Sequence, residues 1–211
     1  MQNQNLEEIF SNIYKNDLWK MGQNESSSGL GSTLNYTENI RNKLVNFINE
    51  KSIYNMLDTS CGDWNWMKLI KEQLCNYIGI DIVENIIKNN NREFSNEKIK
   101  FIHSEFLTYI KNLPDNSIDL ILCRHTLEHL PTDYNLKFLD ECKRVCKYLF
   151  ITGYVDNNKH NSELNKGYYR PVNLDLEPYF NKLNIYYYDK FYDGPSDKHT
   201  EQMYMYIYKF N

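Results

Sequence analysis

The sequence lacks an excess of positive charge. Its 24 Lys and Arg residues are outnumbered by 28 Asp and Glu residues, so the formal net charge at pH 7 is −4. Proteins that bind duplex DNA or RNA carry clusters of Lys and Arg that neutralise the phosphate backbone. Because no such cluster is present, we do not expect a nucleic acid as partner.

Long apolar runs are missing too. No stretch reaches the roughly 20 apolar residues that a membrane helix requires, and residues 1–10 lack the basic and apolar blocks of a secretory signal peptide. We therefore expect no membrane association and a cytoplasmic location. The length of 211 residues suits one buried core. We expect a single domain, in which residues 1–50 add helices and a loop to a core formed by residues 51–211.

Cysteine is scarce and odd in number. Five Cys residues cannot all pair with one another. Four of them lie within apolar segments, where Cys commonly serves as a small hydrophobic residue: Cys75, Cys123, Cys142 and Cys146. We therefore expect neither a disulfide framework nor a bound metal ion.

Helical periodicity marks the N-terminal part of the chain. Apolar residues recur at helical spacing over residues 6–14. The Gly and Ser residues within 22–33 have the composition of a flexible loop. A second helical pattern covers residues 37–49, and its inner face carries four apolar side chains, Ile40, Leu44, Phe47 and Ile48.

The rest of the chain alternates between strand-like and helix-like segments. Short apolar runs predict five strands, at Ile53–Leu57, Tyr77–Ile80, Ile99–Ile102, Ile118–Cys123 and Tyr148–Thr152. Such alternation is typical of a parallel sheet with helices on both faces. Two Tyr-rich runs, Leu183–Tyr188 and Gln202–Tyr208, lack a full helical pattern between them and predict an antiparallel pair at one edge. The expected fold is a Rossmann-like, doubly wound α/β sheet of seven strands, mostly parallel with an antiparallel C-terminal strand.

The loop after the first predicted strand indicates a ligand site, because ligands of open α/β sheets bind at the carboxyl ends of strands. Gly62 lacks a Cβ and allows a sharp turn and a close approach. Asp81 ends the second strand, 23 residues beyond Asp58, where a carboxylate can accept hydrogen bonds from both ribose hydroxyls. Alternatively, Gly62 only allows the turn, and Trp64 and Trp66 only pack in the core. A nicotinamide site would need G-x-G-x-x-G, whereas this loop offers one glycine.

Two motifs at these strand ends resemble those of a known family. The segments LDTSCGDWNWM and YIGIDI are similar to the first two cofactor motifs of class I S-adenosylmethionine-dependent methyltransferases. That family usually has G-x-G-x-G after the acid, and here Ser60, Gly62 and Trp64 stand at the glycine positions. This departure resembles a bacterial subset with a CGDxNWM-like loop and an upstream ESxSGxGSTL-like segment, here residues 25–34. Similar sequences are associated with capsule and surface-glycan biosynthesis, and the resemblance covers residues 19–173.

The resemblance implies S-adenosylmethionine as the cofactor and assigns residues to it. Asp58 and Gly62 would flank its methionine part, and Asp81 would hold its ribose. Ser104 or Glu105 would accept a hydrogen bond from the adenine amino group, although an acid like Glu105 also matches the charge of a helix N-terminus. The remaining candidate cofactor contacts are Ile82, against the adenine, and Ser60, Trp66 and Cys123.

The fourth predicted strand ends in RHTLEHL, a segment rich in reactive side chains. A hydroxyl that accepts a methyl group must lose a proton near the transition state, and a His with an ordinary pKa of about 6.5 suits that role. His125 is the candidate base, and His129 shares its face if the segment is helical. Their spacing also suits a pair of metal ligands, but no third ligand is evident nearby in the sequence. We therefore expect no bound metal ion. Arg124 is a candidate anion-binding group. Alternatively, both His residues are satisfied by their neighbours.

The acceptor is expected to be a small molecule. The segment NKGYYRPVNLD follows the fifth predicted strand. Its tyrosines, Tyr168 and Tyr169, can stack on sugars or bases, and Arg170 offers a rigid fork of donors to a phosphate or carboxylate. An ordinary Tyr-rich surface lid is the alternative. The predicted acceptor site is completed by three residues of the Ser/Gly loop, Ser26, Ser27 and Ser28.

Three functions fit these observations. The first is O-methylation of a small, polar, anionic acceptor, such as a sugar, a nucleotide-linked sugar or a phosphoramidate group. The second is N-methylation of a small amine, which needs less base catalysis because a neutral amine is already nucleophilic. The third is a partner subunit that binds the cofactor without activity, suggested by the missing glycines around Gly62. Whether the chain is a monomer or a homodimer is left open.

Overall fold

The computed structural model is a single sheet covered by helices, and it describes residues 6–155, 161, 169–183, 187–195 and 203–210. The sheet has seven strands in the order β3-β2-β1-β4-β5-β7-β6. Their bounds are β1 Asn55–Asp58, β2 Asn76–Asp81, β3 Ile99–His103, β4 Ile118–Cys123, β5 Cys146–Tyr154, β6 Asp189–Tyr192 and β7 Met203–Lys209. Strands β1 to β5 run parallel, and β7 is antiparallel to both of its neighbours, β5 and β6. The predicted fold class is confirmed.

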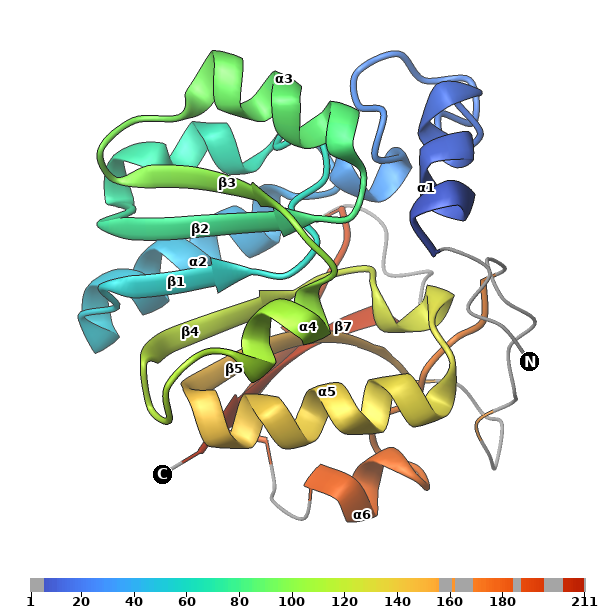
Figure 1. Ribbon diagram of the computed structural model, residues 1–211. Helices are drawn as coiled ribbons and strands as arrows, with labels where there is room; N and C mark the ends of the chain where they lie inside the picture. Colours follow the sequence, from blue (N-terminus) through green and yellow to red (C-terminus); the bar gives the residue numbers. More distant parts are fainter. Residues whose placement is uncertain (1–5, 156–160, 162–168, 184–186, 196–202, 211) are drawn as a thin grey trace.

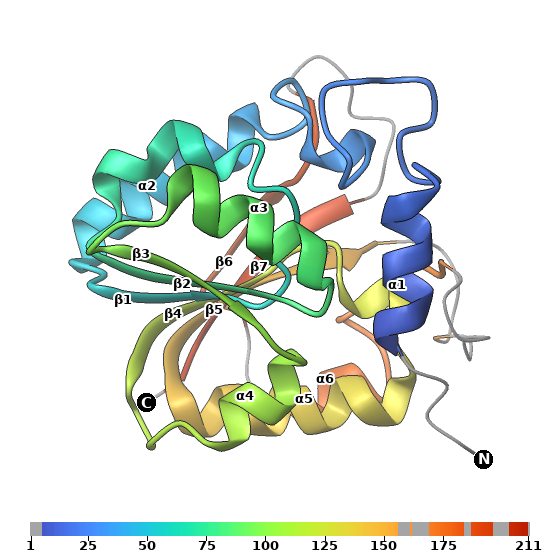
Figure 2. The same cartoon turned by 45° about the horizontal axis from the view of Figure 1, so that its top comes forward.

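Helices cover both faces of the sheet (Figures 1 and 2). One face carries α2 (Glu38–Lys51), the 3-10 helix η2 (Met67–Gln73) and α3 (Glu84–Phe94), and the other carries α4 (Phe106–Lys111), α5 (Thr132–Val145) and α6 (Tyr179–Leu183). The strands supply alternate residues to two separate apolar clusters: Leu57 and Ile121 pack with α4 and α5, whereas Met56 and Leu120 pack with α2 and η2. The sheet is therefore buried on both sides, as parallel sheets generally are.

The predicted N-terminal helices are both present. Helix α2 buries the four expected residues, Ile40, Leu44, Phe47 and Ile48. Helix α1 (Leu6–Lys15) buries one residue fully, Ile13, and lies beside the carboxyl ends of the strands (Figure 2). It covers the edge of the sheet where ligands of this fold class bind. None of the described helices is long and apolar enough to cross a membrane.

Two expectations about local structure are wrong. The strand predicted at Leu183–Tyr188 is displaced, because Leu183 ends helix α6 and β6 begins at Asp189. Its Tyr-rich composition favoured a strand, whereas Pro178, directly before α6, is a helix-start signal that was missed. Cys75 is exposed rather than buried, since it lies in the connection to β2 and not within the strand.

Candidate active site

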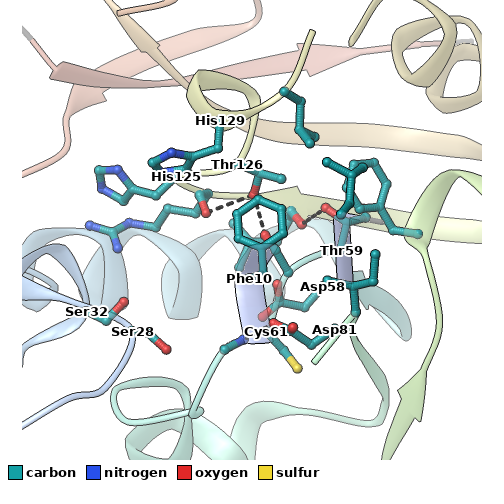
Figure 3. A pocket seen from close by; sticks show the side chains of 18 of the residues that line it. Phe10, Ser28, Ser32, Asp58, Thr59, Cys61, Asp81, His125, Thr126 and His129 are labelled. Carbon is teal, nitrogen blue, oxygen red and sulfur yellow. Dashed lines mark hydrogen bonds between the residues drawn. The ribbon is translucent and has the colours of Figure 1, made fainter. Parts of the chain in front are cut away.

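The main pocket lies at the carboxyl ends of β1, β2 and β4, where the strand order reverses direction. This is the position at which open α/β sheets bind ligands. The pocket holds about 890 Å³ of empty space, including the part open to solvent. Figure 3 shows His125 and His129 toward one side of it and Asp58 and Asp81 toward the other. Its walls come from the loops after these strands, from helix α1 and from the segment of residues 28–32.

The loop after β1 forms the floor of the pocket. Gly62 adopts a φ of 54°, in the left-handed region that glycine tolerates best. Trp64, at the last glycine position of the family motif, has a φ of 56° although it carries a large side chain. Its ring is buried against Phe94 and Phe101, so packing holds a backbone conformation that a non-glycine residue rarely adopts.

Asp81 lies at the end of β2 and lines the pocket. Its Oδ2 atom accepts a hydrogen bond from the backbone N–H of Gly62 at 3.1 Å, and Oδ1 accepts one from Val83 at 2.9 Å. Burial raises the pKa of Asp81 to about 6, against the lowering effect of these N–H donors. A carboxylate oxygen can accept more than one hydrogen bond. The Asp81 carboxylate can therefore accept further hydrogen bonds from two hydroxyl groups of a ligand.

Asp58 lies at the end of β1 and also lines the pocket. Its Oδ2 atom accepts a hydrogen bond from the Tyr77 hydroxyl at 2.8 Å. Burial raises the pKa of Asp58 to about 7, with the hydrogen bond from Tyr77 acting in the opposite direction. A positive group in the pocket would therefore favour ionisation of this carboxyl group.

The predicted adenine contacts differ in their surroundings. Ile82 lines the pocket. Glu105 lines it too, but its carboxylate caps helix α4 by accepting hydrogen bonds from the backbone N–H groups of Leu107 and Thr108 at 2.8 and 2.9 Å. Ser104 is outside the pocket lining, and its hydroxyl donates to the carbonyl of Glu105. The alternative interpretation of Glu105 as a helix-end acid thus has direct structural support.

The Ser/Gly loop is held by hydrogen bonds rather than free. Asp63 accepts hydrogen bonds from the Ser26 hydroxyl at 2.9 Å and from the Ser27 backbone N–H at 2.7 Å. Glu25 accepts one from the Asn65 side chain at 2.8 Å. Ser26 and Ser27, predicted to bind the acceptor, therefore bind the CGDWNWM loop instead. The two motifs therefore form one structural unit.

Of the three serines predicted to bind the acceptor, Ser28 lines the pocket. Its Oγ accepts a hydrogen bond from the backbone N–H of Asp63 at 2.9 Å and lies 2.9 Å from the hydroxyl of Tyr14, on helix α1. A Cβ added at Gly62 would overlap Ser28 Oγ. Gly62 is thus required by the contact between the two loops, in addition to any contact with a ligand.

His125 lines the opposite side of the pocket and is held in an unusual conformation. It has a φ of 54°, which is rare for a residue with a side chain. Its Nδ1 atom lies 2.9 Å from Oε1 of Glu128, a residue that is 1% exposed. Burial opposes ionisation of Glu128, but the hydrogen bond and positive charge of His125 outweigh it, so the pKa of Glu128 lies below its ordinary value. A buried carboxylate thus orients the imidazole, as in catalytic His dyads.

The second imidazole nitrogen of His125 is without a hydrogen bond among the described residues. This Nε2 atom lies 3.9 Å from Oδ2 of Asp193, which is beyond hydrogen-bond distance. A Cβ at Gly31 would lie 3.1 Å from it, so a larger residue there would crowd the ring. With Nδ1 held by Glu128, Nε2 is the ring nitrogen left to accept a proton, and this atom is itself buried.

His129 also lines the pocket but has apolar surroundings. Its ring centroid lies 5.4 Å from that of Trp19 and 6.4 Å from that of Phe10. Burial lowers the pKa of His129, although the nearby charge of Glu128 acts in the opposite direction. The residue ends the 3-10 helix η3 (Leu127–His129), whereas His125 precedes that helix, so the two rings do not share a face of one regular α-helix. A neutral His129 is best suited to shaping the pocket.

Arg124 lines the pocket, yet its charge is already neutralised. Its Nε and Nη2 atoms donate to both carboxylate oxygens of Asp193 at 2.9 to 3.1 Å, and Nη1 donates to the carbonyl of Gly31 at 2.7 Å. Both members of this ion pair are buried. Arg124 therefore joins three segments of the chain, and a free anion would have to compete with Asp193 for it.

Two other predicted residues lie away from the pocket lining. Arg170 is 4% exposed, and its Nη2 donates to the carbonyl of Leu130 at 3.0 Å and to the hydroxyl of Tyr179 at 3.2 Å. The prediction that Arg170 holds the acceptor is therefore a poor fit, because its guanidinium binds the protein interior. Cys123 is buried in the apolar cluster beneath α5, and burial raises its pKa to about 12.

The remaining predicted residues differ in their position relative to the pocket. Trp66 and Ser60 line the pocket, and the Ser60 hydroxyl is hydrogen-bonded to that of Thr126. Tyr169 is exposed, with its ring 6.1 Å from His129, and Tyr168 lies outside the described residues. Among the described residues, no group of three His, Cys, Asp or Glu side chains could hold a metal ion.

Several lining residues were not predicted. Helix α1 and the turn after it contribute aromatic side chains to the pocket, Phe10, Tyr14 and Trp19. No spacing rule connects these residues to the strand ends, since their contact depends on where the helix lies. Glu128 is not itself a lining residue, and its role as the partner of His125 was also missed, although its position three residues after His125 was a usable signal.

Residues 57–148, which include the end of β1, all of β2 to β4 and most of the pocket, match the family model of the methyltransferase domain. The phosphoethanolamine N-methyltransferase of Plasmodium falciparum is 33% identical over 141 residues, which cover 64% of this chain and 49% of that protein. The chain thus spans about half the length of this curated relative. Both similarities support the predicted enzyme class for this part of the chain, whereas the link to a capsule-associated subset remains a prediction.

Solved structures of methyltransferases share the fold. One is an S-adenosylmethionine-dependent methyltransferase from Leishmania major, with a TM-score of 0.67 and 18% identity over 97% of this chain and 86% of that chain. Another is the magnesium protoporphyrin IX methyltransferase from Synechocystis with bound S-adenosylmethionine, with a TM-score of 0.64 and 11% identity over 100% of both chains. At these identities, the likeness concerns the fold of the methyltransferase and not its acceptor.

Proposed function

We propose that this methyltransferase binds S-adenosylmethionine in the main pocket and transfers the methyl group to a hydroxyl oxygen of a small polar acceptor. The Gly62 turn, the Asp81 carboxylate with lone pairs to spare and the buried Asp58 suit the ribose and the methionine part of this cofactor. When bound, the cofactor supplies a methyl group on a positively charged sulfur.

The observation that carries the choice of acceptor is the pairing of His125 with Glu128. Methylation of a hydroxyl group requires removal of its proton, and a general base with a pKa near neutrality is effective at this step. Glu128 holds Nδ1 of His125 at 2.9 Å and stabilises the imidazolium that forms when Nε2 takes up the proton. The acceptor hydroxyl is therefore expected near Nε2, against the segment that contains Gly31.

The charge of the pocket bears on the nature of the acceptor. Its described lining includes the carboxylates of Asp58, Asp81 and Glu105, whereas the lining guanidinium, Arg124, is paired with Asp193. Together with the interior position of Arg170, this gives no support to the predicted anionic acceptor. An uncharged sugar is our preferred class, and a nucleotide-linked sugar fits this lining less well because its phosphates are anionic. A role in capsule or surface-glycan biosynthesis rests on the resemblance of the CGDWNWM loop.

N-methylation of a small amine is a second candidate, favoured by the similarity to the phosphoethanolamine N-methyltransferase of Plasmodium falciparum. A neutral amine can attack without loss of a proton beforehand, so His125 would then serve as a binding group. The carboxylates that line the pocket are compatible with an amine.

Formation of S-adenosylhomocysteine in the presence of sugars, nucleotide-linked sugars and small amines tests the proposal. With a hydroxyl acceptor, His125→Asn should lower kcat about 10²- to 10⁴-fold, because the variant keeps hydrogen bonding but lacks a base. Asp133→Asn is the control, since Asp133 is an exposed residue of α5 outside the pocket lining. Turnover by His125→Asn close to that of the wild type at pH 7 would reject the base and favour the amine. Cofactor binding without turnover for any acceptor class would favour a non-catalytic partner subunit.

A further inference from the structure

Three buried side chains form a hydrogen-bonded chain that ends at the pocket. The indole Nε1 of Trp64 donates to the hydroxyl of Tyr77 at 2.9 Å, and that hydroxyl donates to Oδ2 of Asp58 at 2.8 Å. Trp64 is 1% exposed, Tyr77 0% and Asp58 4%. Only Asp58 lines the pocket, so the other two residues can influence a ligand only through it.

The hydrogen bonds of this chain run from Trp64 toward Asp58. An indole N–H can donate but cannot accept, so the Tyr77 oxygen must be its acceptor. The hydroxyl of Tyr77 donates to Oδ2 of Asp58. This hydrogen bond favours the form of the carboxyl group in which Oδ2 is unprotonated.

The position of Trp64 sets this chain apart from ordinary core packing. It occupies the last glycine position of the family motif and keeps a φ of 56°, a backbone conformation that is unfavourable for a residue with a side chain. A smaller apolar residue could fill the space but would lack the N–H that orients Tyr77. The strained site thus holds a donor where the usual glycine has none.

We infer that Tyr77 is a positioning residue: its hydroxyl, oriented by Trp64, holds Asp58 so that the carboxylate is presented to the ammonium group of the cofactor. This inference rests on the proposed function, because it requires that the methionine part of S-adenosylmethionine lies at Asp58. The positive ammonium group and the Tyr77 hydroxyl both favour the ionised carboxylate, and burial opposes it. Tyr77 therefore extends the pH range over which the pocket can hold the cofactor.

Other titratable and charged groups near Asp58 must be separated from this effect. Burial raises the pKa values of the two nearby thiols, Cys61 and Cys123, so both stay neutral near pH 7. Arg124 favours the carboxylate of Asp58, whereas Asp81 opposes it, and the pKa of Asp81 is itself raised to about 6. A single pH profile therefore contains the contributions of two carboxyl groups. Asp81 contributes to the pH profiles of both the wild type and a Tyr77 variant. Its contribution therefore cancels when the midpoints of the two profiles are compared.

The test measures the affinity for S-adenosylhomocysteine by calorimetry between pH 5.5 and pH 8.5, for the wild type and for Tyr77→Phe. Affinity of the wild type should rise with pH and then level off. In Tyr77→Phe the ring still fills its site, but the donor to Asp58 is lost, so the midpoint of the rise should move upward by about one pH unit. Trp64→Phe removes the N–H and should produce a smaller shift in the same direction.

A matched control separates the lost hydrogen bond from a general effect on the core. Tyr148→Phe removes a hydroxyl from another buried tyrosine, on β5 and outside the pocket lining, and should leave the midpoint unchanged. A midpoint in Tyr77→Phe equal to that of the wild type, with measurable binding by both, would overturn the role of Tyr77 alone. A wild type that binds no S-adenosylhomocysteine at any pH would overturn the proposed cofactor as well. Equal shifts of the midpoint in Tyr77→Phe and Tyr148→Phe would overturn the role of Tyr77, because the shift would then be a general effect of core packing.

Discussion

The Nδ1 atom of His125 lies 2.9 Å from Oε1 of Glu128, and the carboxylate is buried. The pair comes from a turn and a 3-10 helix that follow β4, so one short segment supplies both the base and the group that orients it. The left-handed backbone of His125 places its ring at the pocket, where a residue in a regular strand would point elsewhere.

Glu128→Gln tests this pairing separately from the loss of the base itself. Glutamine keeps the size of the side chain but cannot stabilise an imidazolium, and it can hold the wrong tautomer of His125. We expect kcat to fall by about 10²- to 10⁴-fold, with the affinity for S-adenosylhomocysteine nearly unchanged. Steady-state kinetics and calorimetry on the same preparation measure the two effects. Unchanged kcat would mean that Glu128 only fills the core.

Gly62→Val should abolish cofactor binding, because a side chain there overlaps Ser28 Oγ and the residue has a φ of 54°. The milder Gly62→Ala should weaken binding of S-adenosylhomocysteine less. Adding Ser28→Ala to Gly62→Ala should recover part of the loss, since it removes the overlapping oxygen. Calorimetry of the single and double variants gives the coupling between the two residues. Full binding by Gly62→Val would show that the loop does not hold the ligand.

Asp58 should make the protein without cofactor less stable as pH rises. Burial raises the pKa of Asp58 to about 7, so the folded protein binds this proton more tightly than the unfolded chain does. The stabilisation is complete below the unfolded pKa, near 4, and is lost as pH rises through 7. Between pH 5 and pH 8, Asp58→Asn should therefore gain about 1 to 3 kcal/mol in unfolding free energy relative to the wild type.

Urea unfolding at both pH values measures this change. Asp133→Asn is the control, because its side chain is 74% exposed and its folded and unfolded environments are similar. A difference between Asp58→Asn and the wild type that is the same at pH 5 and pH 8 would contradict the assigned shift.

Arg170→Ala should lower stability rather than raise the Michaelis constant selectively. The guanidinium binds the carbonyl of Leu130 and the hydroxyls of Thr132 and Tyr179 in the interior. Loss of these charge-assisted bonds should reduce the unfolding free energy by about 2 to 4 kcal/mol. Chemical unfolding measures it, with the exposed Arg92→Ala as control. An unchanged stability together with a raised Michaelis constant would restore the acceptor role that the sequence suggested.

Local patterns predicted the fold and identified strand-end residues that line the pocket. Asp58, Gly62 and Asp81 were found because each directly ends or follows a strand, and the carboxyl ends of parallel strands meet at one edge. The same reasoning placed β4 and β7 within a residue or two of their observed bounds. Alternating periodicity is a local property, so it survives without knowledge of distant contacts.

The acceptor side could not be predicted in the same way. Ser26 binds Asp63, which is 37 residues away in sequence, and Arg170 binds Leu130, 40 residues away. A polar side chain in a loop has the same local pattern whether its partner is a ligand or another loop. The position of helix α1, which adds Trp19 to the pocket, likewise depends on tertiary packing.

The most direct test of the proposed cofactor site is a calorimetric titration of the protein with S-adenosylhomocysteine, in parallel with Asp81→Ala. The wild type should bind one equivalent. Loss of a carboxylate that accepts two ribose hydrogen bonds should cost on the order of 2 to 4 kcal/mol, so Asp81→Ala should bind about 30- to 900-fold more weakly at equal thermal stability, with Asp133→Ala binding like the wild type. Equal affinity of the wild type and of Asp81→Ala would contradict the assignment of this pocket to the cofactor.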